Sequence, residues 1–254
     1  MKLTVLGCGT SFGVPRIGGD WGKCDPAEPR NRRRRVSILV EHEGARILVD
    51  TSPDLREQLL AARVSTVDAV IWTHDHADHC HGIDDLRGLS YRRGGAIPAY
   101  ARPETLASLR ARFGYVFEGK GGYTAIAEAT ALPDALEVGP IRVRTVDQPH
   151  GAITSAGLRF DAGGRSIAYS TDFNELTDEM KEAFQGLDVW VVDALRRRPH
   201  PTHPHLALAV EWIGILRPAR AILTHMDNSM DYRTLCDELL PGAEPGFDGL
   251  EVTL

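Results

Sequence analysis

The sequence has few cysteines and no excess of positive charge. Its four cysteines, at positions 8, 24, 80 and 236 of 254, are scattered and form no Cys-x-x-Cys pair. This spacing gives no basis for a disulfide framework and predicts a reduced, cytoplasmic protein. The 35 acidic residues outnumber the 29 basic ones, giving a net charge of −6. An acidic balance argues against binding along extended nucleic acid, which requires a broad basic surface.

Long apolar runs are absent as well. No segment approaches the roughly 18 consecutive apolar residues that cross a bilayer. The opening MKLTVLGCGT has no apolar stretch long enough for a signal peptide. We therefore expect no membrane partner. The 43% of hydrophobic residues can still bury a core, which excludes a disordered chain. Because no repeat or linker divides the sequence, we predict one domain over residues 1–254.

Several short apolar runs end in, or lead to, a single polar residue. The residues in question are Asp50, His74, His150, Asp172, Asp193 and His225. Short continuous apolar runs are typical of strands buried on both faces. Polar residues at the ends of such strands collect along one edge of a sheet, where we expect the functional site.

Helical spacing of apolar residues separates these runs. It predicts helices over 53–63, 103–113, 206–216 and 231–239, with another beginning near 177. The stretch 161–165 is typical of a hairpin turn. The pattern therefore predicts an α/β fold of two packed sheets flanked by helices.

Histidines are concentrated in one segment, His74-Asp75-His76-Ala77-Asp78-His79. Imidazole and carboxylate groups are metal ligands, but four of them on one tight loop cannot all reach one ion. They can serve two ions about 3.5–4 Å apart, the arrangement that many hydrolases use. The strand-end residues His150, Asp172 and His225 would complete both sets, and Asp172 has two oxygens with which to bridge them. This agreement disfavours an ordinary histidine-rich surface loop.

The H-x-H-x-D-H run and the three later ligands resemble the metallo-β-lactamase superfamily. The opening LGCGTSFGVP (6–15) and the ending PGFDGLE (245–251) resemble one branch of it. That branch holds the cyclic-phosphate phosphodiesterase of the carbon–phosphorus lyase pathway and is related to the tRNA 3′-processing nucleases. The resemblance implies an αββα sandwich with two mixed sheets, two divalent metal ions (zinc or manganese), hydrolysis of a phosphodiester and a homodimer.

The resemblance also implies roles for single residues. The first metal would be held by His74, His76 and His150, the second by Asp78, His79 and His225, with Asp172 between them. Asp50 would steady the histidine loop from behind the ligands. The candidate general acid is His203, with His200 and His205 as the alternatives. The branch's additional structural zinc requires clustered cysteines, whereas residues 20–26 contain only Cys24, so we predict no such zinc.

The charges of this predicted site favour an anionic substrate. Two divalent ions carry +4, from which Asp78 and Asp172 remove 2. Water bound to the ions would have its pKa lowered to about 7, and the resulting hydroxide would attack phosphorus while His203 protonates the leaving oxygen.

Basic and aromatic residues supply candidates for substrate binding. In the run Arg30–Arg35, Arg33 and Arg35 are candidates for binding phosphate together with His205, and Arg196–Arg198 could act similarly. A solvated surface is the alternative for either run. Phe12, Trp21 and Tyr91 could each stack on a base or sugar.

We therefore predict a dinuclear metallohydrolase for a small phosphodiester, such as a cyclic ribose phosphate or a nucleotide. The alternatives are a tRNA 3′-end endonuclease, a hydrolase of thioesters, carboxylic esters or lactams, and a non-enzymatic carrier. The acidic charge and the lack of a long basic arm argue against the nuclease, since residues 117–123 contain only Lys120 among several glycines. The complete ligand set argues against a carrier, and the His203 segment favours a phosphodiester.

Overall fold

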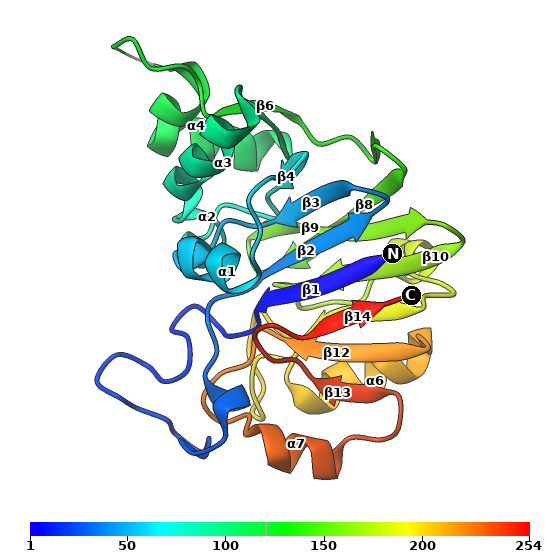
Figure 1. Cartoon of the computed structure of the whole chain (residues 1–254). Helices are drawn as coiled ribbons and strands as arrows, with labels where there is room; N and C mark the ends of the chain where they lie inside the picture. The colour runs from blue at the N-terminus through cyan, green and yellow to red at the C-terminus, as the bar shows by residue number, and fades with distance from the viewer. Residues whose placement is uncertain (120) are drawn as a thin grey trace.

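Two seven-stranded sheets form the centre of the structure (Figure 1), a computed structural model that describes residues 1–119 and 121–254. Lys120, noted above, lies outside the described residues. The first sheet consists of β1 (Lys2–Gly7), β2 (Ser37–His42), β3 (Ala45–Val49), β4 (Ala69–Ile71), β5 (Ile97–Ala101), β6 (Ala127–Ala131) and β14 (Glu251–Thr253). The second consists of β7 (Ala135–Val138), β8 (Ile141–His150), β9 (Ile153–Ala162), β10 (Arg165–Ser170), β11 (Val189–Asp193), β12 (Arg220–Thr224) and β13 (Ala243–Pro245).

Helices cover the outer face of each sheet. They are α1 (Leu55–Ala61), α2 (Ala77–Cys80), α3 (Leu86–Arg93), α4 (Pro103–Glu118), α5 (Asp178–Ala183), α6 (Leu206–Leu216) and α7 (Tyr232–Glu238). Apolar residues of α1, α3 and α4 pack on the first sheet, and those of α5, α6 and α7 belong to the cluster that contains the second. The expectation of two mixed sheets flanked by helices is confirmed. No helix in the described part of the chain is both long and apolar enough to cross a bilayer.

The strand sequences are continuously apolar because both faces of each sheet are buried. In β2, Ile38 and Val40 point into the core between the sheets, whereas Leu39 belongs to the cluster under the helices. In β3, Ile47 and Val49 alternate in the same way with Leu48. This period of two, with apolar residues at both phases, is what a strand between two apolar layers requires.

Strand directions bring several chain segments to one edge of the sandwich. In the second sheet the order is β13-β12-β11-β10-β9-β8-β7, and β10, β11 and β12 are parallel neighbours. Since β8 and β10 both run antiparallel to β9, the carboxyl ends of β8, β10, β11 and β12 lie at the same edge. In the first sheet β3 and β4 are parallel in the same manner. The residues that follow these strands are therefore neighbours in space.

The glycine-rich opening and the PGFDGLE ending meet beside β1, which lies between β14 and β2 (Figure 1). The carboxylate of Asp248 accepts hydrogen bonds from the backbone N–H groups of Cys8 (3.2 Å) and Arg34 (2.7 Å). A Cβ on Gly7 would lie 2.1 Å from the carbonyl oxygen of Arg35, so only glycine fits there. These contacts hold the opening and ending segments of the chain together beside the first sheet.

Asp248 predicts a pH dependence of stability. Burial raises its pKa from 3.8 to about 7, although the N–H groups of Arg34 and Cys8 act in the opposite direction. The folded state therefore keeps a proton that the unfolded chain releases above about pH 4. We expect the free energy of unfolding of wild type, relative to Asp248→Asn, to fall between about pH 4 and pH 7, by at most about 1.4 kcal/mol per pH unit. Urea denaturation of both proteins in EDTA measures this; a difference that does not vary with pH would contradict it.

Candidate metal centre

Polar residues just beyond the strands meet at the shared edge. Asp50 follows β3 directly, His74 lies three residues after β4, His150 ends β8, Asp172 follows β10 by two residues and His225 follows β12 directly. Three of them have left-handed backbones, with φ of 62° at Asp50, 54° at Asp172 and 57° at His225. Such conformations are uncommon for residues other than glycine and cluster at functional sites. The sharp turn after each strand directs these side chains across the sheet edge.

The seven predicted metal ligands converge into two adjacent sets. Donor atoms of His74, His76, His150 and Asp172 all lie within 4.8 Å of one another. Those of Asp78, His79 and His225 do the same. Asp78 and His79 lie in the short helix α2, whereas His74 and His76 lie in the loop before it. The loop residues therefore belong to one set and the helix residues to the other. The structure thus brings together residues that span positions 74 to 225.

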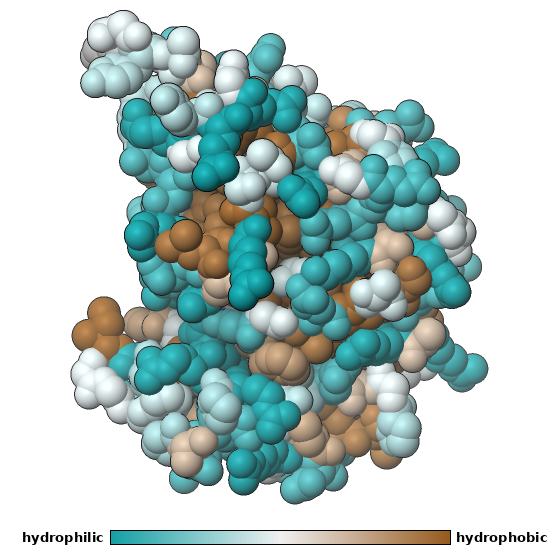
Figure 2. Space-filling view, viewed as in Figure 1, coloured by the Kyte–Doolittle hydropathy of each residue, from teal (hydrophilic) through white to brown (hydrophobic). Residues whose placement is uncertain are grey.

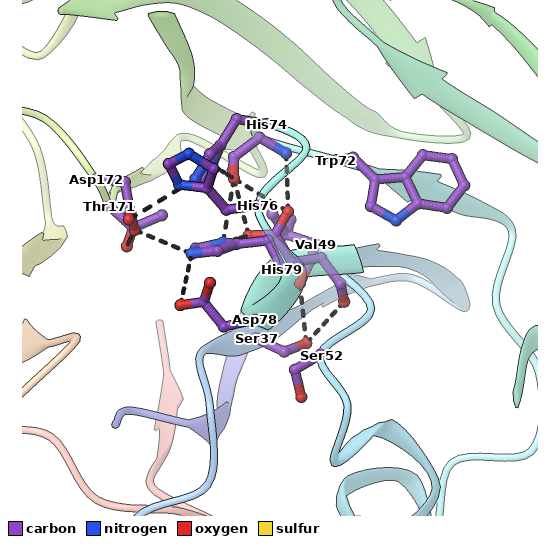
Figure 3. A network of polar contacts seen from close by, with 12 residues as sticks. Ser37, Val49, Ser52, Trp72, His74, His76, Asp78, His79, Thr171 and Asp172 are labelled. Carbon is purple, nitrogen blue, oxygen red and sulfur yellow. Dashed lines mark hydrogen bonds and ion pairs between the residues drawn. The ribbon is translucent and has the colours of Figure 1, made fainter. Parts of the chain in front are cut away.

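Asp172 lies between the two sets, with one oxygen toward each. Its Oδ1 is 3.7 Å from Nε2 of His74 and 3.7 Å from Nε2 of His150. Its Oδ2 is 3.1 Å from Nε2 of His79 and 3.6 Å from Nε2 of His225. In Figure 3 the His79 ring lies between the carboxylates of Asp78 and Asp172, toward which its contacts are drawn. This is the geometry of a bridging carboxylate.

The spacing of these atoms fits divalent ions. Ligands bound to zinc at about 2.0–2.1 Å in a tetrahedron are separated from each other by about 3.4 Å. Here Nε2 of His150 lies 3.4 Å from Nδ1 of His76, and Nε2 of His225 lies 3.3 Å from Oδ2 of Asp78. The Nε2 atoms of His74 and His79 are buried and form no hydrogen bond in the structure. A buried nitrogen without a hydrogen-bond partner is costly unless a cation takes its lone pair.

The charge of the site also calls for cations. The aspartates at positions 50, 78, 172 and 193 are buried, and no lysine or arginine among the described residues lies within ion-pairing distance of their carboxylates. Burial acts to lower the pKa of His225, but Asp172 and Asp193 outweigh it and raise the pKa to about 9. Two divalent ions would balance the four negative charges, and the donor set of imidazoles and carboxylates suits zinc or manganese. The residues present therefore fit two ions.

Asp50 holds the histidine loop from behind. Its Oδ2 is 2.7 Å from Nδ1 of His79, and its Oδ1 accepts a hydrogen bond from the backbone N–H of Thr73 at 2.8 Å. The hydroxyl of Thr73 donates to the same carboxylate and lies 3.1 Å from Nδ1 of His74. With Nδ1 of His79 donating to Asp50, the lone pair of Nε2 points at the centre, as a metal ligand requires.

Replacing Asp50 by alanine is therefore expected to weaken metal binding without removing a ligand. Partners of this kind typically contribute 10- to 100-fold in metal affinity. We expect Asp50→Ala to raise the Kd of the more weakly held ion by about that factor, measured by competition with a metal-sensitive dye. An unchanged Kd in a protein whose circular dichroism matches wild type would refute this role.

His203 and Asp193 form a second histidine–carboxylate pair beside the ligands. Nδ1 of His203 lies 2.8 Å from Oδ2 of Asp193, and its Nε2 lies 3.8 Å from Oδ1 of Asp172. The His203 ring stacks on that of His225 with centroids 4.9 Å apart. Sequence reasoning noted Asp193 as a strand-end residue but gave it no role. The sequence feature that could have identified Asp193 is its position at the end of an apolar strand, which it shares with Asp50 and Asp172.

Of the other two candidate acids, one lies at the rim and one lies elsewhere. A cavity of about 320 Å³ opens over the centre, and its wall includes His200 and His203 but not His205. His205 instead precedes the first residue of α6 as its N-cap. Its side chain forms no capping hydrogen bond and lies outside the cavity wall.

The structure also places Arg33 and Arg35 outside the cavity. Arg33 is 2% exposed, and its guanidinium donates to the carbonyl oxygens of Met230 (2.6 Å) and Asp227 (3.2 Å). Arg35 pairs with Asp54 through Nε at 3.1 Å. The structure therefore does not place Arg33, Arg35 or His205, the residues expected to bind phosphate, in the cavity wall, and intramolecular partners occupy the two arginines. Arg33 also lies beside the buried Cys24, 3.9 Å from its sulfur.

The chain matches known proteins over most of its length. The model of the Beta-lactamase superfamily domain matches residues 45–226. An octanoyltransferase of Porphyromonas gingivalis is 32% identical over 260 residues, which cover 100% of this chain and 52% of that protein. This chain thus spans about half the length of that relative.

Two solved structures resemble the fold described above. A diphosphatase from the PhnP family is 37% identical, with a TM-score of 0.91 over 100% of this chain and 97% of that one. Human tRNase Z, short form, shares the fold with a TM-score of 0.71 over 100% of this chain and 99% of that one, at 16% identity. The superfamily and the branch inferred from the sequence are confirmed: the chain belongs to the β-lactamase superfamily and, within it, to the PhnP family.

Proposed function

We propose that this chain is a metal-dependent phosphodiesterase acting on a small phosphodiester, of the cyclic ribose phosphate or nucleotide type. Two divalent ions would be held by His74, His76 and His150 on one side and by Asp78, His79 and His225 on the other, with Asp172 between them. When bound, such ions supply positive charge for phosphoryl oxygens and lower the pKa of water so that hydroxide is available at neutral pH. The name of the 37% identical diphosphatase supports a phosphate-containing substrate.

The observation that carries the proposal is the His203–Asp193 pair. Hydrolysis of a phosphodiester releases an alkoxide, which needs a proton, and a positioned histidine is the usual donor. Nδ1 of His203 donates to the carboxylate of Asp193, which orients the ring so that Nε2 faces the cavity, where it would protonate the leaving oxygen. Hydrolysis of a thioester depends less on such an acid, because a thiolate is a less basic leaving group than an alkoxide.

Other residues of the cavity would position the substrate and the general acid. Asp172 and the imidazoles would hold the ions that bind the reacting phosphate, and His203 lies in the cavity wall together with His200 and Thr202. The carbonyl oxygen of Thr202 accepts a hydrogen bond from Nδ1 of His150 at 2.9 Å, which orients that ligand and the His203 segment together. The acid and the metal ligands are therefore positioned as one unit.

Turnover of bis(p-nitrophenyl) phosphate tests the proposal. We expect the protein, reconstituted with Zn²⁺ or Mn²⁺, to hydrolyse it faster than a thioester or a chromogenic lactam, and EDTA to abolish the activity. The His205→Asn variant serves as a control, because its side chain lies outside the cavity. A metal-loaded protein inert toward every phosphodiester but active on the thioester or lactam would overturn the assignment.

Two finer expectations stay predictions. The resemblance implies a homodimer, which size-exclusion chromatography with light scattering would test. The cytoplasmic location inferred from cysteine usage is likewise a prediction, testable by fractionation of the source cells.

A further inference from the structure

Helix α6 is apolar on the side that faces solvent as well as on the side that faces the core. Its sequence, LALAVEWIGIL, contains one charged residue, Glu211. Ala209 and Trp212 are buried in the apolar cluster that contains the second sheet. The solvent-facing residues follow the helical spacing i, i+3, i+4, i+7, i+8 and are Ala207, Val210, Glu211, Gly214 and Ile215. A helix with apolar residues all round is normally covered on both sides.

The outer face of α6, defined by these five residues, exposes side chains that nothing in the described chain covers. Ile215 is 51% exposed and Val210 is 37% exposed. A Cβ on Gly214 would meet no atom within 4 Å, and its backbone is helical, so this chain's own packing does not require glycine there. Glycine weakens a helix relative to alanine. A second helix that crosses at Gly214 would require it, because the side chains at the crossing set the distance between two helix axes.

The two charges at this face are placed for pairing with an identical helix. Glu211 lies three residues before Gly214, and Arg217 lies three residues after it. Neither forms an ion pair within residues 1–119 or 121–254, and Nε of Arg217 donates to the carbonyl oxygen of Gly214 at 3.3 Å. In an antiparallel pair that crosses at Gly214, each Glu211 is level with Arg217 of the partner subunit. A two-fold axis makes both contacts at once.

We infer that the outer face of α6 is the centre of an interface between two copies of this chain, with the two helices antiparallel and crossing at Gly214. Because α6 connects the parallel strands β11 and β12, it begins at the sheet edge that carries the metal centre and ends at the opposite edge. Antiparallel pairing therefore directs the two metal centres away from each other and leaves both cavities open. A helix of 11 residues is about 16 Å long, so the surface around α6 would supply the rim of the interface.

A second apolar patch differs from the α6 face in its charges. Figure 2 shows this patch over α1, where Leu60 is 59% exposed and lines a groove of about 470 Å³. Charged side chains also line the groove, namely Arg56, Asp84, Asp85, Arg87 and Arg92. The centre of a protein interface is depleted of charged residues, which favours α6 over this patch.

Sedimentation velocity over a concentration series of the full chain, loaded with Zn²⁺, tests the interface. We expect wild type to dimerise, and Ile215→Asp to raise the dissociation constant of the dimer by about tenfold or more, because a charge would be buried at its centre. Leu60→Asp is the matched control on the α1 patch and should dimerise like wild type. Both variants should keep the circular dichroism and metal content of wild type, since neither residue belongs to the metal centre.

Exchanging the two charges tests the antiparallel register. Glu211→Arg and Arg217→Glu each bring like charges together and should weaken the dimer by about fivefold or more. The double variant restores opposite charges in reversed order and should recover most of the affinity. Gly214→Leu should weaken the dimer but leave the monomer at least as resistant to urea as wild type, since leucine favours a helix over glycine.

Each outcome supports or overturns the interface without reference to catalysis. A wild type that stays monomeric throughout the series would overturn the proposal and assign the α6 face to a different partner. A dimer that survives Ile215→Asp, or that is lost only in Leu60→Asp, would place the interface elsewhere. A double variant no tighter than the single ones would overturn the pairing at Gly214. None of these measurements depends on phosphodiesterase activity, so their failure is distinct from failure of the proposed function.

Discussion

His203→Ala is expected to lower kcat by about 10²- to 10⁴-fold on phosphodiesters with alkyl leaving groups. The loss should be much smaller on bis(p-nitrophenyl) phosphate, because p-nitrophenolate leaves without a proton. The reason lies in the geometry: His203 is held through Nδ1 by Asp193, and Nε2 is the atom left free to act on the leaving group. Steady-state kinetics on a series of leaving groups of increasing basicity measures the effect.

Metal content distinguishes this role from ligation. Nε2 of His203 lies 3.8 Å from Asp172, and its donor atom also falls within 4.8 Å of those of Asp172, Asp193 and His225. A general acid can be removed without loss of metal, so His203→Ala should retain two ions by elemental analysis. A drop in bound metal would make His203 a ligand and refute the acid assignment. His205→Ala is the matched control and should change neither quantity.

The second large effect is expected at Asp172. Because its two oxygens face different ligand sets, Asp172→Asn replaces one of them by an NH₂ group that cannot bind a cation. Residues that hydrogen-bond to a metal ligand typically contribute 10- to 100-fold in metal affinity. We expect Asp172→Asn to lower the affinity for at least one ion by more than this, and phosphodiesterase activity to fall to background. Elemental analysis after dialysis and the bis(p-nitrophenyl) phosphate assay measure the two effects.

Asp75 provides the matched control for this substitution. It belongs to the same histidine-rich segment, but its Oδ2 accepts from Ser108 at 2.5 Å and pairs with Arg112 at 3.3 Å, away from the two ligand sets. Asp75→Asn should therefore keep both ions. If Asp172→Asn kept two tightly bound ions and full activity, the bridging role of Asp172 would be excluded.

The convergence of the candidate ligands could be predicted from the sequence because it depends on short-range signals. Each ligand outside the histidine segment lies at or just beyond the end of a strand, and the carboxyl ends of these strands share one edge of the sheet. The helix over 206–216 was predicted with its observed bounds, since its apolar spacing is regular. α4 continues to Glu118 beyond the predicted end at Phe113, where the backbone kinks (φ −127°, ψ 35°) and interrupts the regular spacing.

What the sequence could not show depends on distant contacts. Arg33 stands in a run of arginines that resembles an exposed basic face, and only the fold reveals the Asp227–Met230 carbonyls that bury it, almost 200 positions away. The pairing of Asp193 with His203 likewise depends on a loop conformation that no local pattern encodes. The short strands β13 and β14, of three residues each, have too few positions to show a period.

The most direct test is a crystal structure of the protein reconstituted with Zn²⁺ or Mn²⁺, with anomalous scattering to locate the metal. We predict two ions about 3.5–4 Å apart, with one oxygen of Asp172 on each. His74, His76 and His150 should surround one ion, and Asp78, His79 and His225 the other. A single ion, or two ions that do not share Asp172, would contradict the arrangement from which the chemistry was derived.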